Sequence, residues 1–158
     1  MPRIIQYDLL AEPTSAAYIA LLTVGRGACE RFSLVQQPQL SFSPEADRVT
    51  GSLRPFLIVE REASEWPGTR LLSHTACVRD YRMTHDSAKV LIAEAEGLYG
   101  WRAPDRPEDL VLWRDPEEPW LVSISHERDG YLLITGAEHD ELAGLSPDLI
   151  RILRKKSN

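Results

Sequence analysis

Cysteine is scarce in this sequence: the 158 residues contain only Cys29 and Cys77, and the two do not form a CxxC pair. Two cysteines are too few for a disulfide framework. The alternatives are a single bridge between them or two reduced thiols, and we expect the thiols, because disulfides are rare in cytosolic proteins. A chain of this length buries enough surface to fold without disulfides or metals.

Long apolar runs are also missing. The longest, residues 16–24, has nine residues, whereas a membrane-spanning helix needs about 20. Asp8 and Glu12 precede this run, where a secretory signal peptide would need net positive charge. We therefore expect a cytoplasmic protein without a membrane anchor, and we interpret the run as a buried strand.

Positive charge is in the minority. Eighteen lysines and arginines stand against 24 acidic residues, which gives a formal net charge of −6. Such a chain repels phosphate backbones, so no nucleic-acid partner is expected. The densest basic cluster consists of Arg151, Arg154, Lys155 and Lys156. We interpret it as the end of a C-terminal helix, where the helix dipole favours cations.

The composition, 43% hydrophobic and 27% charged residues, is that of an ordinary globular protein. We expect one domain over residues 1–158. Apolar and alternating patterns predict strands in the first half of the chain, at residues 3–10, 16–24, 30–36, 56–60 and 71–83. The segment 37–55 is rich in proline and polar residues, which predicts a long loop.

The second half has clearer signals. Apolar residues at helical spacing predict a helix over residues 86–99, with Thr84 or Asp86 as its cap and Gly100 at its end. Strands are predicted at 110–113, 120–125 and 131–135, and they form a β-meander because short turns separate them. Two short helices follow, the first opened by a capping box and the second by Ser146 and a proline. The expected fold is α+β: a twisted antiparallel sheet of six or more strands, one main helix and two short C-terminal helices.

Motifs for catalysis and cofactor binding are absent. The sequence contains no Walker loop, no G-x-G-x-x-G and no G-x-S-x-G elbow, and its four histidines lack ligand spacing. We therefore expect neither a metal nor a cofactor. Ser125, His126 and Asp129 have the composition of a triad, but a regular strand would turn Ser125 and His126 to opposite faces. His126 and Asp129 remain the catalytic candidates.

Tryptophans gather near the turns of the predicted meander. Trp101, Trp113 and Trp120 lie beside turns or at strand ends, and Arg128 follows in the next turn. Tryptophan in such places either holds a loop to the core or forms a hot spot at a protein interface, especially beside arginine. We take these four residues as the candidate binding surface.

Two functional hypotheses follow. A small acidic domain without catalytic motifs is similar in a general way to bacterial immunity and adaptor proteins, with no residue-level correspondence. The leading hypothesis is thus a non-enzymatic module that binds a protein partner or itself, without nucleic acid or membrane. The alternative is a small hydrolase or ligand-binding enzyme that uses His126 with a nearby carboxylate. It requires a pocket that contains His126, a second titratable group and a hydrogen-bond donor.

Overall fold

An eight-stranded antiparallel sheet forms the centre of the computed structural model, which describes residues 2–157. The strand order is β10-β1-β9-β8-β7-β2-β6-β3, and every neighbouring pair is antiparallel. The strands are β1 (Ile5–Leu9), β2 (Arg31–Gln36), β3 (Leu57–Ala63), β6 (Ala76–Arg82), β7 (Glu108–Trp113), β8 (Pro119–Ile124), β9 (Asp129–Ile134) and β10 (Leu153–Lys155). The predicted α+β class is confirmed. The meander β7–β8–β9 is confirmed as well, with its strand ends within two residues of the prediction.

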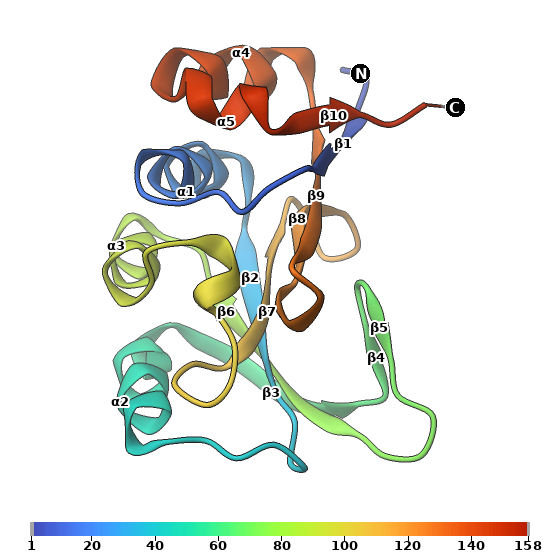
Figure 1. Cartoon of the computed structure of the whole chain (residues 1–158). Helices are drawn as coiled ribbons and strands as arrows, with labels where there is room; N and C mark the ends of the chain where they lie inside the picture. The colour runs from blue at the N-terminus through green and yellow to red at the C-terminus, as the bar shows by residue number, and fades with distance from the viewer. Residues whose placement is uncertain (1, 158) are drawn as a thin grey trace.

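The helices cover one face of the sheet, and a small hairpin stands on the other (Figure 1). The helices are α1 (Ala16–Ala28), α2 (Pro44–Leu53), α3 (His85–Glu94), α4 (Gly136–Leu145) and α5 (Pro147–Arg151). Three 3-10 turns, η1 (Arg54–Phe56), η2 (Leu98–Gly100) and η3 (Ser125–Glu127), complete this set. The hairpin consists of β4 (Glu65–Trp66) and β5 (Thr69–Arg70). None of the helices within residues 2–157 has both the length and the apolar character to cross a membrane.

The main core lies between the helices and the sheet. Phe32, Leu112 and Leu132 point into it from three strands and are completely buried. A smaller cluster lies on the opposite face, where Trp66 of the hairpin packs against Val35 and Val78. The hairpin therefore covers part of the sheet face that the helices leave exposed.

The prediction of a strand over residues 16–24 is wrong, because this segment forms most of α1. A short continuous apolar run does not distinguish a buried strand from a buried helix. Helix α1 contacts α3, α4 and the sheet, so it needs apolar residues nearly all around. Gly25 and Gly27 lie inside this helix. Gly25 there permits close contact, since a methyl group on it would lie 2.7 Å from Cδ1 of Leu112.

Other boundaries in the first half also differ from the prediction. The segment 37–55 is not one long loop, because it contains α2, which buries Val49 and Leu53. The strand predicted over 71–83 shortens to β6, and Leu72 before it is 94% exposed. Helix α3 ends at Glu94, so Gly100 closes the separate turn η2 instead.

The helix starts in the second half agree with the sequence. The side chain of Thr84 accepts a hydrogen bond from the amide of Ser87, and Thr135 does the same for Glu138. Ser146 caps α5, whose first residue is Pro147. These caps satisfy amides of the first helical turn, which have no partner within the helix.

Candidate functional site

Two neighbouring carboxylates are buried at the start of β7. The pairing of β2 with β7 shifts register between Ser33 and Val35, which is the mark of a β-bulge. Glu108 is 3% exposed, and Asp109 is completely buried. Asp109 has a φ of 55°, in the left-handed region that residues other than glycine rarely adopt. Such backbone strain is concentrated at functional sites.

Asp109 holds three separate elements together. Its Oδ1 accepts a hydrogen bond of 2.9 Å from the amide of Ser125 in η3. Its Oδ2 accepts one of 2.9 Å from the indole nitrogen of Trp66 in the hairpin. Burial raises the pKa of Asp109, and these two bonds oppose that rise. Asp109 is thus a positioning residue that places η3 over the start of β7.

Glu108 opens onto a cavity that also contains His126. The cavity has a volume of about 360 Å³, and it is lined by Gln37, Leu40, Arg102, Ala103, Glu108 and His126. The amide nitrogen of Gln37 donates a hydrogen bond of 3.3 Å to Glu108. Burial raises the pKa of Glu108, the charge of Asp109 adds to the rise, and His126 opposes it. The His126 side chain is 49% exposed, so it sits between the buried acid and solvent.

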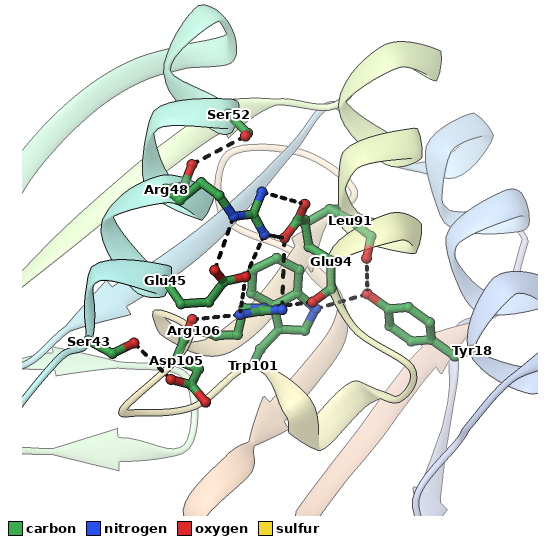
Figure 2. Close-up of polar contacts among 10 residues, drawn as sticks. All are labelled: Tyr18, Ser43, Glu45, Arg48, Ser52, Leu91, Glu94, Trp101, Asp105 and Arg106. Carbon is green, nitrogen blue, oxygen red and sulfur yellow. Dashed lines mark hydrogen bonds and ion pairs between the residues drawn. The ribbon is translucent and has the colours of Figure 1, made fainter.

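The rim residues Arg102 and Ala103 belong to a loop that two helices hold in place. At its start, Nε1 of Trp101 donates a hydrogen bond of 2.8 Å to Oη of Tyr18, which itself donates to the carbonyl oxygen of Leu91 (Figure 2). At its end, Nε of Arg106 donates a bond of 2.6 Å to the carbonyl oxygen of Glu94. The loop is therefore fixed to α1 at Trp101 and to α3 at Arg106.

Charged residues of α2 strengthen the same connection. Arg48 lies between two carboxylates, with Nη2 at 2.6 Å from both Glu45 and Glu94 (Figure 2). Oγ of Ser43 also donates a bond of 2.7 Å to Asp105 in the loop (Figure 2). These contacts join α2, α3 and the 101–106 loop. Arg102 of this loop takes part in none of them and lines the cavity.

Of the two catalytic candidates predicted from the sequence, only one lines the cavity. His126 lies in the cavity, but Asp129 does not line it. Oδ1 of Asp129 instead accepts a hydrogen bond from the amide of Gly130, at the start of β9. The expectation of a regular strand through Ser125 and His126 is wrong, because β8 ends at Ile124 and the two residues belong to η3. Ser125 is buried, and its Oγ has no hydrogen-bond partner among the described residues.

The candidate binding residues do not form an exposed aromatic face. Trp101 and Trp120 are completely buried, and Trp113 is nearly so. Nε1 of Trp113 donates a hydrogen bond of 3.0 Å to Ser33, so its ring belongs to the sheet. Arg128 is exposed, but it forms an ion pair of 3.0 Å with Glu12. These tryptophans fill the interior because strand ends and loops close over them.

The carboxylate that accompanies His126 is Glu108, which sequence reasoning missed. The only available signal was a pair of acids immediately before the apolar strand at 110–113. Charged residues are almost never fully buried without a partner, so two acids at this place point to a special environment. Their approach to His126 depends on the bulge, which the sequence does not reveal.

Comparisons with protein families, curated proteins and solved structures find no match, so the chemistry of the site is the only guide to its role. Between residues 2 and 157, no three His, Cys, Asp or Glu side chains are placed to hold a metal ion. The cavity combines a buried acid, an imidazole at the mouth, an amide donor and a guanidinium at the rim. These groups can bind a small polar molecule and exchange protons with it.

Proposed function

We propose that the chain binds a small polar molecule in the Glu108 cavity and acts on it by acid–base chemistry, as a small hydrolase would. The observation that carries the proposal is the presence of Glu108 and His126 in one cavity. The raised pKa of Glu108, caused first by burial, lets it keep a proton at a higher pH than an exposed glutamate. An imidazole accepts or donates protons near neutral pH.

In a hydrolytic step His126 removes a proton from water while the water oxygen attacks the substrate. Glu108 in its neutral form gives its proton to the leaving group. The scissile bond, one O–H bond of water and the O–H bond of Glu108 break, while a bond from the substrate to the water oxygen, an N–H bond on His126 and an O–H bond on the leaving group form. Transfer of the His126 proton to the Glu108 carboxylate then restores both side chains. The Arg102 guanidinium at the rim supplies a positive charge for the polar end of the substrate. Asp109 takes no part in the transfer and keeps η3 in position through Ser125.

The test uses 4-nitrophenyl esters, phosphates and glycosides as chromogenic substrates. We expect the wild-type protein to hydrolyse one class, with a loss of roughly 100-fold or more in Glu108→Gln and in His126→Gln, as for removal of a general acid or base. His85→Gln is the matched control, because His85 is exposed at the start of α3 and lies outside the cavity. Equal activity in all variants would overturn the proposal. So would a protein that hydrolyses none of the three classes and shows no NMR shifts at cavity residues with small polar compounds.

Protein binding is a second candidate, and the free edge of β3 favours it. In the part of the chain that the structure describes, β3 pairs with β6 alone and ends the strand order. Ile58 on this edge is 53% exposed, and Val59 is 44% exposed. An exposed edge can accept a further strand from a partner or a second copy. Sedimentation velocity over a range of concentrations tests self-association, which Val59→Lys should abolish. If the wild-type protein is monomeric at every concentration, self-association through the β3 edge is excluded.

A further inference from the structure

A basic hollow lies beside the paired strands β1 and β10, which β9 and β8 separate from β7, the strand that carries Glu108. Its volume is about 690 Å³, compared with about 360 Å³ for the Glu108 cavity. The charged side chains on its wall are Arg3, Lys155 and Lys156, and the remaining described wall residues are neutral. Three positive charges therefore meet around one depression in a protein whose net charge is −6.

From the sequence, the basic residues from Arg151 to Lys156 are interpreted as the end of a helix. This interpretation is wrong for Arg154, Lys155 and Lys156. Helix α5 ends at Arg151, and Lys155 lies on β10 at the edge of the sheet. The dipole of α5 acts only within its last turn, so it does not account for Lys155 or Lys156. Another reason for three adjacent cations is needed.

Among residues 2–157, the three cations have no acidic partner within ion-pair distance. Arg3, Lys155 and Lys156 are all exposed. Arg151, only a few positions earlier, forms one of 2.8 Å with Asp148. Asp8 on β1 lies opposite Arg154 and accepts a hydrogen bond of 3.0 Å from Gln6.

The wall of the hollow is held by backbone pairing. Tyr7 of β1 lies opposite Lys155, and the amide of Lys156 donates a bond of 2.9 Å to the carbonyl oxygen of Gln6. β1 in turn pairs with β9, where Gln6 lies opposite Leu133. Lys155 thus projects from a hydrogen-bonded strand, and Lys156 follows it directly with its amide bonded to β1.

We propose that this hollow binds a small phosphorylated anion with at least two negative charges, such as an inorganic polyphosphate or a nucleoside polyphosphate. Converging lysine and arginine side chains form charge-assisted hydrogen bonds with phosphate oxygens. The size of the hollow admits more than one phosphate group. The acidic remainder of the surface repels long polyanions, so the ligand is a small molecule.

The test is isothermal titration calorimetry at low ionic strength with inorganic phosphate, pyrophosphate and tripolyphosphate. We expect saturable one-to-one binding that tightens from phosphate to tripolyphosphate and weakens with added salt. Lys155→Gln combined with Lys156→Gln should weaken tripolyphosphate binding at least tenfold. Lys89→Gln combined with Arg151→Gln is the matched control, because it removes the same charge away from the hollow and should bind as wild type.

Three results would overturn the proposal. One is the absence of saturable binding for all three anions. The second is an equal loss in the control variant, which would show a general charge effect. The third is tighter binding of a single-stranded oligonucleotide than of tripolyphosphate. Circular dichroism of both double variants verifies that they fold, and the Glu108 cavity plays no part in these outcomes.

Discussion

The indole nitrogen of Trp66 donates a 2.9 Å hydrogen bond to Oδ2 of Asp109, and this bond ties the β4–β5 hairpin to the start of β7. The other oxygen of Asp109 accepts a bond from the amide of Ser125. One buried carboxylate thereby connects three segments that are distant in sequence. Because His126 follows Ser125, the position of the imidazole depends on this carboxylate.

Trp66→Phe is expected to destabilise the protein by about 1–3 kcal/mol, because it leaves a buried carboxylate oxygen without its donor. Urea denaturation measures the loss. A double-mutant cycle with Asp109→Asn isolates the pair, and the two changes together should cost less than the sum of each alone. Additive costs would show that the bond contributes nothing to stability.

Glu108→Gln is expected to raise the melting temperature at pH 7. Burial, with a further contribution from Asp109, raises the pKa of Glu108 in the folded state, so stability is lost as the pH rises above the unfolded-state pKa of about 4.3, and the loss is complete above the folded-state pKa. The penalty disappears as the pH falls and the folded-state carboxyl takes up its proton. Calorimetry should therefore show the largest gain of the variant at pH 7 and a much smaller one near pH 4. A lower melting temperature at pH 7 would contradict this account.

The ion pair between Arg114 and Glu138 should make stability depend on pH in the opposite direction. The guanidinium of Arg114 binds both carboxylate oxygens of Glu138, at 2.9 and 2.7 Å. Burial of Glu138 favours its neutral form, but the bonds from Arg114 and Thr135 outweigh it, so its pKa is lowered in the folded state. The stabilisation is present above the unfolded-state pKa of about 4.3 and is lost as the pH falls through the folded-state value.

Arg114→Gln should accordingly cost about 1–2 kcal/mol at pH 7 and much less at pH 3, as measured by chemical denaturation. Arg151→Gln serves as the control. It removes an exposed ion pair with Asp148, and such pairs contribute at most about 1 kcal/mol. Equal losses in the two variants would show that the Arg114–Glu138 pair has no special role.

Gly25→Ala and Gly27→Ala test the packing of α1. A methyl group at position 25 would lie 2.7 Å from Cδ1 of Leu112 and 3.3 Å from Cζ3 of Trp120, both of which are completely buried. We expect this change to cost about 1–2 kcal/mol, because the added volume outweighs the gain in helix propensity. A methyl group at position 27 meets nothing within 4 Å, so Gly27→Ala should stabilise the protein by up to about 1 kcal/mol. Thermal unfolding of both variants compares them, and the same sign for both would contradict the packing model.

Local sequence patterns account for the elements whose causes lie within a few neighbouring residues. The meander follows from alternating side chains and short turns, and the starts of α3, α4 and α5 follow from capping residues a few positions apart. These interactions lie within one turn or one hairpin, so a short window of residues contains all their participants.

The remaining features depend on contacts between distant parts of the chain. Residues 16–24 form a helix because α3, α4 and the sheet surround them, and a run of apolar residues alone does not distinguish that setting from a buried strand. The tryptophans became interior residues because distant segments cover them. Gln37, Glu108 and His126 meet at one cavity because a bulge in β7 and the bonds of Asp109 bring them together. Contacts between residues so far apart in the chain depend on the packing of the whole fold, which local patterns do not encode.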